Sequence, residues 1–450
     1  MEEVQDAASL GRVAPVSLPP PARVHIIGGG LAGLSAAVEL APQTQVRLYE
    51  AGPSCGGRAR SYYDRALETE IDNGNHLLLS ANPYTFRYLD LLGARDTLRT
   101  PGGPLFPWYD LRDGLAWHLN LGRGRVPYWL LSPHTRVPGM RLREMAGLRN
   151  LLRAGPDEVV ADCLVPGEFS RRLLEPLAVS ALNTDIDSGS AQLLGTIVRR
   201  TLAKGGTACQ PWMAARGLSR SFVTPALDWL KRCHAEVHTG QRITEIVREK
   251  GRVTALNSAS GPIRIGRDEA VILAVPPVVA STLLPEVEGP DAFESIVNAH
   301  FRLPVSTRAK GVVGKAGFVG LVGGMAEWVF LHDRVLSVTV SAANRFADIP
   351  SEVMLNTIWE EISQALNSVL TTPLPLTRPR ARLIREKRAT FAATPLQARR
   401  RPGAVTSTVN LALAGDWTDT GLPSTIEGAI QSGLAAVAAL GFRSGYSKQD

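Results

Sequence analysis

Hydrophobic residues recur along this chain with two different periodicities, and the change between them predicts a parallel sheet near the N-terminus. Residues 24–27 form a short apolar run rich in β-branched side chains, and three glycines follow it. From residue 31 to residue 40 the apolar positions have the spacing of a helix, and residues 46–50 form a second strand-like run. This succession is typical of a β-α-β unit.

The rest of the pattern predicts a second, more antiparallel part of the molecule. Residues 83–207 mix helical stretches with turns rich in Pro and Gly, and residues 300–345 alternate like antiparallel strands. The fold class is therefore predicted to be α/β, with a second part that is α+β. Buried strands are expected at 271–275 and 411–414, and helices at 355–370 and near 425–440.

The turn after the first strand carries a dinucleotide-binding pattern. Gly28 permits the tight turn, Gly30 lets the backbone approach a pyrophosphate, and Gly33 lets the helix pack closely on the sheet. The N–H groups and the positive dipole end of that helix then face the phosphates. Glu50 ends the second strand, 22 positions after Gly28, where a carboxylate can accept both ribose hydroxyls of an adenosine. A glycine-rich turn with an unrelated glutamate is the alternative.

A second polar group follows the last apolar strand. Gly415 and Asp416 come directly after it, so the carboxylate can reach the ribityl hydroxyls of a flavin. Thr425 is a favourable N-cap for the next helix, whose first N–H groups can face the flavin N1–C2=O edge, where negative charge accumulates on reduction. Because one end of the chain fits adenosine and the other fits a flavin, the sequence predicts FAD bound by both ends.

Two further motifs carry a family resemblance: Gly-Gly-Arg at residues 56–58 and Asp-Asn-Gly-Asn-His at residues 72–76. With the motifs above, they resemble the amine oxidase and phytoene desaturase flavoprotein superfamily. The resemblance implies a Rossmann-like FAD-binding domain with an inserted substrate-binding domain. It places Arg58 near the pyrophosphate, residues 72–76 near the isoalloxazine ring and the Val237 backbone beside adenine. A surface arginine and an ordinary edge strand are the alternatives for Arg58 and Val237.

The residues predicted to bind FAD come from all of these motifs. They are Gly28, Gly30, Ala32, Gly33, Glu50, Ala51, Gly57, Arg58, Asn75, His76, Val237, Gly415, Asp416, Thr425, Ile426 and Glu427.

Longer runs resemble a narrower family, the hydroxysqualene dehydroxylases, also called squalene-associated FAD-dependent desaturases. The runs are residues 295–302, 322–330, 337–343, 386–391 and 415–429. The resemblance implies reductive loss of water from hydroxysqualene, which gives squalene for hopanoid biosynthesis, by hydride transfer from N5 of reduced flavin to an allylic cation. It also implies a C30 isoprenoid substrate and an electron donor that the sequence does not identify. The chain departs from that family's pattern at Asn75 and at residues 80–82.

The sequence leaves the proton donor to the leaving hydroxyl open. Asp72, His76 and Glu427 are the catalytic candidates, and the polar side chains of residues 72–76 can instead serve only to satisfy a tight turn. Three other functions also stay open. They are an isoprenoid or carotenoid desaturase that runs the flavin oxidatively, an amine oxidase, and a flavin-bound partner protein without turnover.

Composition narrows the location and the partners. The four cysteines match no metal-binding spacing and predict a reduced, cytoplasmic protein, with Cys55 expected to be a packed thiol. Net charge is +7, but no basic stretch is interleaved with stacking aromatics, so we expect no nucleic-acid partner. The acidic start predicts no secretory signal, and no apolar run is long enough to cross a bilayer.

One basic segment suits a membrane surface. Residues 123–153 hold seven arginines and a single acid, Glu144, with apolar residues among them. Such a segment fits peripheral contact with the inner face of the cytoplasmic membrane, although Arg149 and Arg153 fall near Leu142 on a helical wheel. An ordinary basic surface is the alternative. The basic run at 378–401 is expected to be mostly solvated surface.

Motif order and composition predict three parts of the chain. Residues 1–22 are expected to form a disordered leader. The FAD-binding domain is expected to be discontinuous, and the substrate-binding domain to fill the gaps. The FAD-binding segments are 23–82, 208–290 and 403–442, and the substrate-binding segments are 83–207 and 291–402.

Overall fold

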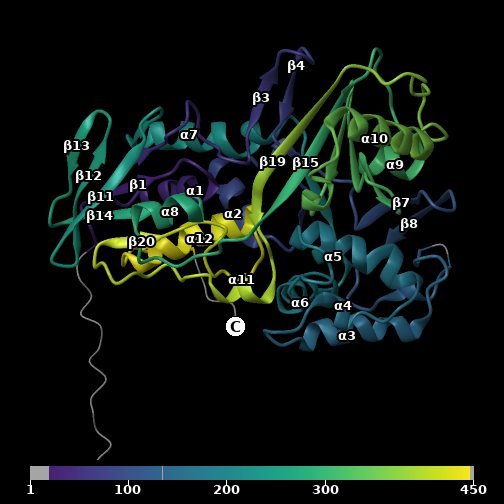
Figure 1. Ribbon diagram of the computed structural model, residues 1–450, viewed down its shortest axis with the longest axis horizontal. Coiled ribbons are helices and arrows are strands. Elements are labelled where there is room, and N and C mark those ends of the chain that lie inside the picture. Colours follow the sequence, from purple (N-terminus) through teal and green to yellow (C-terminus); the bar gives the residue numbers. More distant parts are fainter. Residues whose placement is uncertain (1–19, 134, 446–450) are drawn as a thin grey trace, which may run out of the picture.

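The computed structural model describes residues 20–133 and 135–445. A parallel sheet lies at one end of the molecule and a larger, mostly antiparallel sheet lies at the other (Figure 1). The parallel sheet has the order β10-β2-β1-β14-β20. Its strands are β1 (Arg23–Ile27), β2 (Gln45–Tyr49), β10 (Glu236–His238), β14 (Glu269–Leu273) and β20 (Leu411–Leu413). The predicted α/β fold class and the N-terminal β-α-β unit are confirmed.

Alternate residues of the parallel sheet enter two separate cores, because successive side chains of a strand point to opposite faces. Ile26 and Leu48 pack on one face with helices, whereas Ile27 and Leu273 pack on the other. The helices of the first face are α1 (Leu31–Leu40), α2 (Pro83–Leu92), α7 (Thr224–Arg232) and α12 (Ile426–Ala439). The second face is covered by β11 (Ile243–Glu249), β12 (Arg252–Ser258), β13 (Gly261–Arg264) and α8 (Pro277–Leu283).

At two of the predicted domain boundaries, the observed contacts do not match the prediction. Residues 1–19 of the leader lie outside the described residues, but the Ala22 N–H donates to the Asp268 carbonyl at 2.8 Å, so the end of the leader joins the sheet. Helix α2 falls inside the range predicted for the substrate-binding domain, yet Leu89 is buried in the same core as α1 and α12. The domain boundaries stay a prediction, and this packing does not favour a boundary at residue 82.

The larger sheet has the order β19-β15-β18-β17-β16-β7-β8, and its only parallel pair within the described residues is β16 with β7. Helix α10 (Ser351–Leu366) packs on one of its faces. The helix predicted at 355–370 was therefore placed four residues too late at both ends. Its first turn, residues 351–353, is exposed, so the apolar spacing did not reveal it. The strands are β7 (Leu105–Asp110), β8 (Leu115–Asn120), β15 (Phe293–Arg302), β16 (Phe318–Val322), β17 (Trp328–His332), β18 (Val335–Val340) and β19 (Ala381–Phe391).

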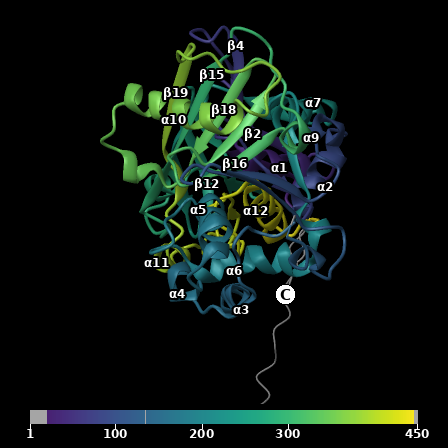
Figure 2. The same ribbon diagram turned by 90° about the vertical axis from the view of Figure 1, so that its right-hand side faces the viewer.

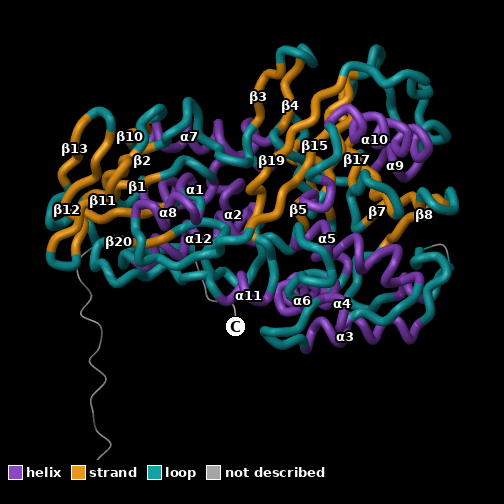
Figure 3. Tube along the Cα trace, in the orientation of Figure 1, coloured by secondary structure: helices purple, strands orange, loops and turns teal. Residues whose placement is uncertain are grey.

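The other face of the larger sheet meets a helical layer, as Figures 2 and 3 show from two directions. Between them lies a group of five aromatic side chains that we call the aromatic cluster. Its members are Trp108, Trp117, Phe318, Trp328 and Phe330. The Trp108 ring stacks on Trp117 with 5.6 Å between centroids, and it lies 4.9 Å from Trp328. The helices are α3 (Ala146–Arg153), α4 (Val160–Cys163), α5 (Glu175–Leu182) and α6 (Ala191–Arg200), with the π-helical turn η4 (Ser170–Leu174).

Among the described residues, no helix combines the length and the apolar character needed to cross a bilayer.

Short elements complete the fold and connect its two ends. The remaining strands and helices are β3 (Ser61–Asp64), β4 (Thr69–Asp72), β5 (Leu78–Leu79), β6 (Leu98–Arg99), β9 (Pro211–Ala214), α9 (Gly311–Ala316) and α11 (Pro395–Arg399). The short helical turns are η1 (Arg95–Thr97), η2 (Tyr128–Leu130), η3 (Leu142–Met145), η5 (Leu202–Lys204), η6 (Gly206–Cys209), η7 (Ser219–Val223) and η8 (Ala343–Phe346).

Candidate flavin-binding active site

The three motif glycines after β1 differ in what surrounds them. A Cβ on Gly28 would lie 2.3 Å from the Ala274 carbonyl oxygen, and one on Gly33 would lie 2.0 Å from that of Gly28. A Cβ on Gly30 would meet nothing within 4 Å. Gly28 and Gly33 are thus needed for packing of the chain itself, whereas the space beside Gly30, at the start of α1, is open. That difference fits a pyrophosphate placed over Gly30, next to the first turn that contains Ala32.

Glu50 lies at the carboxyl end of β2, where ligands of parallel sheets bind. Its Oε2 accepts the Gly29 N–H at 2.8 Å and its Oε1 accepts the Gly52 N–H at 2.6 Å. Each carboxylate oxygen has two lone pairs, so one on each remains for a ribose hydroxyl. The Glu50 N–H also donates to the His238 carbonyl at 2.8 Å. Glu50, Ala51 and the β10 residue Val237 therefore lie together at one corner of the sheet.

The two ends of the chain meet through α1 and α12, which lie side by side (Figure 1). The Ser35 hydroxyl donates to the Ile430 carbonyl at 3.1 Å. A Cβ on Gly433 would lie 2.0 Å from that hydroxyl oxygen and 2.3 Å from the Ala32 carbonyl. Only a glycine permits this approach, and it brings the middle of α12 against the part of α1 that contains Ala32 and Ser35.

An ion pair joins the Gly-Gly-Arg motif at residues 56–58 to Asp416, which follows β20. Arg58 lies 2.6 Å from the Asp416 carboxylate, and it also donates to the Ala389 carbonyl of β19. The carboxylate predicted to reach the ribityl hydroxyls is thus held in place by the arginine predicted to lie near the pyrophosphate. This contact does not favour the alternative that Arg58 is an ordinary surface arginine. The neighbouring Gly57 has a φ of 56°, which suits glycine.

The start of α12 has the geometry expected of a capped helix. Thr425 is the N-cap, and its hydroxyl accepts the Gly428 N–H at 3.0 Å, as predicted. The adjacent Ser424 hydroxyl is buried, and no partner for it lies among the described residues. Together with the open space at Gly30 and the spare lone pairs of Glu50, this hydroxyl fits a bound FAD, whose polar atoms it can contact.

Glu427 has a structural contact that occupies its carboxylate. The side chain is 2% exposed and accepts the Tyr84 N–H at 3.1 Å, the Thr85 N–H at 2.8 Å and the Thr85 hydroxyl at 2.6 Å. It thereby caps the N-terminus of α2. Burial raises the pKa of Glu427, and the hydrogen bonds from Thr85 oppose that rise. Its catalytic role stays a prediction that this geometry does not favour.

Asp72 is also engaged by its own chain. One carboxylate oxygen accepts the Ser61 hydroxyl at 2.6 Å and the Leu218 N–H at 2.9 Å. Burial raises the pKa of Asp72, although both hydrogen bonds oppose it. The side chain connects the β3–β4 hairpin to the segment before α7. These contacts give Asp72 a structural role.

His76 differs from the two carboxylates, because its imidazole has no hydrogen-bond partner among the residues that the structure describes. Burial and, secondarily, the charge of Arg58 lower the pKa of His76 to about 4. The ring is therefore neutral near pH 7 and carries one N–H that can donate. The next residue, Leu77, packs against the hydrophobic core that contains the aromatic cluster. His76 thus lies where the flavin motifs meet the aromatic cluster.

A polar network that the sequence did not reveal fixes this turn. The Asn75 side chain donates to the Thr339 hydroxyl at 3.2 Å, and that hydroxyl donates to the Asn298 side chain at 3.0 Å. Asn298 in turn donates to the Asn73 carbonyl at 3.1 Å. Thr339 of β18 lies opposite Trp328 of β17 in the sheet register, so the network anchors the turn beside the aromatic cluster.

Arg401 is a second residue that the sequence did not reveal. The run 378–401 was expected to be mostly solvated, but Arg401 is 7% exposed. It donates to the carbonyls of Trp417 and Thr418 and to the Thr420 hydroxyl, so it holds the loop after β20. Burial lowers the pKa of Arg401 to about 10. A uniform series of arginines gives no sign of which member turns inward.

Cys55 is buried beside the dinucleotide motif. Burial raises the pKa of its thiol to about 11, so the thiol stays protonated and unreactive. The predicted packed thiol is confirmed.

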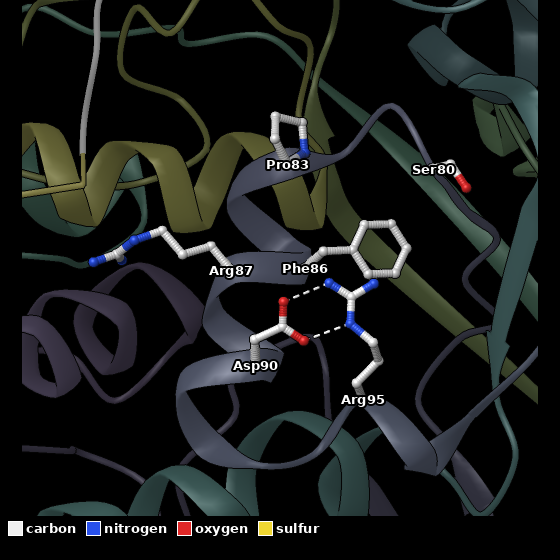
Figure 4. Close-up of a pocket in the computed structure, with 6 residues that line it drawn as sticks. All are labelled: Ser80, Pro83, Phe86, Arg87, Asp90 and Arg95. Carbon is white, nitrogen blue, oxygen red and sulfur yellow. Dashed lines mark hydrogen bonds and ion pairs between the residues drawn. The ribbon is translucent and has the colours of Figure 1, made fainter. Parts of the chain in front are cut away.

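A pocket of about 410 Å³ lies apart from these motifs, beside α2 (Figure 4). Its charged groups are already paired, since Arg95 binds Asp90 and lies over the Phe86 ring at 4.5 Å. Arg87, on its rim, pairs with Glu39. None of the predicted flavin ligands lines this pocket, so it is not the candidate site.

Comparison with known proteins agrees with the fold and the site. Residues 31–441 match the model of the flavin containing amine oxidoreductases, and the chain belongs to this family. It is an FAD-dependent oxidoreductase, as predicted. In structure it is similar to the cyclohexylamine oxidase of Brevibacterium oxydans, with a TM-score of 0.66 and 15% identity over 94% of this chain and 99% of that one.

Relatives of similar length narrow the family. The chain is 43% identical to the hydroxysqualene dehydroxylase of Sinorhizobium fredii, over 92% of this chain and 97% of that protein. It is 41% identical to the hydroxysqualene dehydroxylase of Zymomonas mobilis, over 92% of this chain and 97% of that protein. The resemblance inferred from the longer runs is confirmed.

Proposed function

We propose that this protein is a hydroxysqualene dehydroxylase, which removes the hydroxyl group of hydroxysqualene reductively and gives squalene and water. The nearly full-length similarity to hydroxysqualene dehydroxylases carries the proposal. The reaction balances as one allylic alcohol, one hydride and one proton giving one alkene and one water. Bound FAD, once reduced, supplies the hydride equivalent.

The aromatic cluster is the proposed wall of the substrate site. A C30 isoprenoid exposes only apolar surface apart from its hydroxyl, and the faces of indole and phenyl rings can bury that surface. Leu77, next to the turn of residues 72–76, packs against the core that contains the cluster, and Asn75 of that turn contacts Thr339, which lies opposite Trp328. Exclusion of water from this region would strengthen the electrostatic contacts that the protein makes to the departing hydroxyl.

His76 is the proposed contact to the leaving oxygen. Asp72 and Glu427 already accept hydrogen bonds from their own chain, whereas the His76 ring has no partner among the described residues. Its neutral imidazole can donate an N–H to the oxygen as the C–O bond lengthens. Asn75, held by Thr339, fixes the backbone next to it. We assign Asn75 and Thr339 as positioning residues.

The test is anaerobic incubation of the purified protein with hydroxysqualene and chemically reduced FAD, with products identified by mass spectrometry. Squalene should form with reduced flavin and not with oxidised flavin. His76→Asn should lower kcat about 100-fold, on the scale of one lost donor to a developing charge. His234→Asn is the matched control, because His234 is exposed and has a φ of 58°, which asparagine tolerates.

The same experiment separates the alternatives. Product with additional double bonds, formed only with oxidised flavin, would establish a desaturase. Amine oxidation with no effect on hydroxysqualene would establish an amine oxidase. Protein that binds FAD but converts neither compound under either condition would fit a partner without turnover.

We further propose that the bound FAD is non-covalent and that the enzyme acts in the cytoplasm, at the inner face of the membrane, where its lipid substrate lies. An electron donor of unidentified nature must reduce the flavin after each turnover. Acid precipitation of the purified protein should release a yellow supernatant that contains FAD. Recovery of FMN or of no flavin after reconstitution would contradict the cofactor assignment.

A further inference from the structure

Large apolar side chains are exposed together in one short segment at the far end of the molecule from the parallel sheet. Between residues 126 and 142, Leu131 is 76% exposed, Tyr128 69%, Leu142 65% and Val126 55%. The segment lies in the lower right of Figure 1, next to α3. Exposed apolar residues that occur singly need no explanation, but four within one such stretch indicate a surface that meets something other than water.

The same segment presents positive charge that nothing neutralises. Six arginines of residues 123–153 are exposed, and none of them forms an ion pair with any described residue. They are Arg123, Arg125, Arg141, Arg143, Arg149 and Arg153. Some exposed arginines elsewhere are neutralised by a nearby acid: Arg399 and Arg400 of the run 378–401 pair with Asp157 and Asp291.

The one acid of the segment is turned inward. Glu144 is 2% exposed, and its carboxylate accepts the Arg141 N–H at 3.0 Å and the Phe169 N–H at 2.6 Å. It therefore shapes the loop and connects it to η4 without reducing the charge at the surface. The surface carries apolar and cationic groups and no exposed carboxylate within residues 123–153.

Beneath this surface the same segment contributes to the core that contains the aromatic cluster. Trp129 and Met140 are buried there, and the Trp129 ring lies 6.4 Å from that of Phe169. Exposed Tyr128 and Leu131 thus flank a buried tryptophan of the proposed substrate region. The exposed apolar residues and the aromatic cluster are thus connected to the same hydrophobic core.

We propose that Val126, Tyr128, Leu131 and Leu142, with the six exposed arginines, form a docking surface for an anionic lipid bilayer. A bilayer takes up both kinds of group: aliphatic side chains enter the acyl boundary, arginines contact phosphates, and tyrosine suits the interface between them. A nucleic acid would use the arginines but leave the leucines in water. The inference deepens the proposed function, on which it rests only for the lipid nature of the substrate.

The test is co-sedimentation of the full-length, FAD-loaded protein with vesicles of mixed phosphatidylglycerol and phosphatidylcholine, and with vesicles of phosphatidylcholine alone. Wild type should bind the mixed vesicles far more tightly, and added salt should weaken that binding. The double variant Arg141→Gln, Arg143→Gln should bind the mixed vesicles at least tenfold more weakly, since each cation near an anionic surface contributes about fivefold. The double variant Leu131→Ser, Leu142→Ser should lose about tenfold or more, and the binding left to it should be more sensitive to salt.

Two matched controls lie elsewhere on the surface. Leu376→Ser removes a leucine that is 101% exposed and isolated in sequence from other exposed apolar residues. Arg264→Gln with Arg267→Gln removes two exposed arginines in and beside β13, at the opposite end of Figure 1. Both controls should bind mixed vesicles like wild type.

Several outcomes would overturn the proposal. Equal binding of wild type to both kinds of vesicle, or equal loss in the controls and the docking variants, would do so. Tight binding of duplex RNA that the leucine substitutions leave unchanged, without vesicle binding, would replace a bilayer by nucleic acid. Vesicle binding is measured without hydroxysqualene, so it fails or succeeds independently of the proposed reaction. Conversely, docking variants should still convert hydroxysqualene supplied in detergent.

Discussion

The closest contacts of three glycines differ between the two ends of this molecule. At the flavin end, backbone lies against backbone: Gly33 and Gly433 have no room for a Cβ, and their nearest neighbours include carbonyl oxygens. At the aromatic end, side chain lies against side chain, and the nearest neighbour of a Cβ on Gly320 would be the Trp108 ring, at 2.4 Å. Backbone segments cannot move without disturbing their hydrogen bonds, whereas a ring can shift within its cluster. The flavin end is thus specified atom by atom, and the aromatic end by volume and polarity.

The largest expected effect comes from adding a single methyl group at each end. Gly433→Ala should separate α1 from α12 and lower the free energy of unfolding by roughly 3 kcal/mol or more, with loss of bound FAD. Gly320→Ala should cost less, because the Trp108 ring can give way. Thermal unfolding and flavin content measure both, with Gly403→Ala as a control at a position open on all sides. Equal losses for Gly433→Ala and Gly320→Ala would remove the distinction between the two ends.

The second prediction concerns the larger sheet, whose stability should decrease at acid pH because of a buried histidine. His300 of β15 is fully buried, its ring lies 2.8 Å from the Ser337 hydroxyl, and burial lowers its pKa to about 4. Between pH 6.5 and 4 the unfolded chain binds a proton that the folded chain does not, so stability falls as the pH falls. The loss for His300 is on the order of 3 kcal/mol.

Denaturant unfolding measured across that pH window checks this expectation. His300→Gln should be less stable near pH 7 but should show a smaller decline toward pH 4 than wild type does. His234→Asn, at an exposed position, should leave the decline unchanged. A decline that His300→Gln does not reduce would place the acid sensitivity elsewhere.

Substitution of Glu50 tests whether its carboxylate binds the ribose of FAD. Glu50→Ala should weaken FAD binding at least tenfold, because each hydrogen bond to a charged acceptor contributes roughly 1.5–3 kcal/mol. Titration of apoprotein by flavin fluorescence measures it. Since Glu50 also accepts two backbone N–H groups, Glu50→Gln separates the roles: it keeps the side-chain shape and one acceptor oxygen. Unchanged affinity in a folded Glu50→Ala protein would show that this carboxylate is not the ribose ligand.

The smallest expected effect concerns the ion pair between Arg58 and Asp416, which is partly exposed. A double-mutant cycle with Arg58→Gln and Asp416→Asn should give a coupling of about 0.5–1 kcal/mol in apoprotein stability, as usual for pairs near solvent. Calorimetry of the four proteins measures it. Zero coupling would mean that the pair contributes to orientation of the cofactor and not to stability.

The sequence predicted local features of the flavin end, because each of them depends on neighbouring residues in the chain. The turn at Gly28 and the cap at Thr425 each depend on a few consecutive residues, and such requirements appear directly in the residue types. The docking of α1 on α12 was not predicted, since Ser35 and Gly433 are far apart in sequence and unremarkable alone. Arg401 was missed for the same reason: its partners lie after β20.

The aromatic end could be predicted only through resemblance. No periodicity identifies Trp108, Trp117 and Trp328 as neighbours, because they come from three strands of one sheet. The link from Asn75 through Thr339 to Asn298 likewise depends on register between strands, which sequence spacing does not specify. Glu427 was named as a catalytic candidate, but its contact with α2 depends on tertiary packing, which the sequence does not show.

The junction of α1 with α12 also sets the order of events during synthesis. The dinucleotide turn leaves the ribosome early, whereas β20 and α12 are made near the end of the chain. At ordinary elongation rates the interval is ~20–80 s. Throughout that time the nascent chain has the residues of the dinucleotide turn and can form the contacts of α1 with α7, but the surface of α1 that packs on α12 stays uncovered. A site that needs both ends of the chain is therefore complete only after α12 has been made.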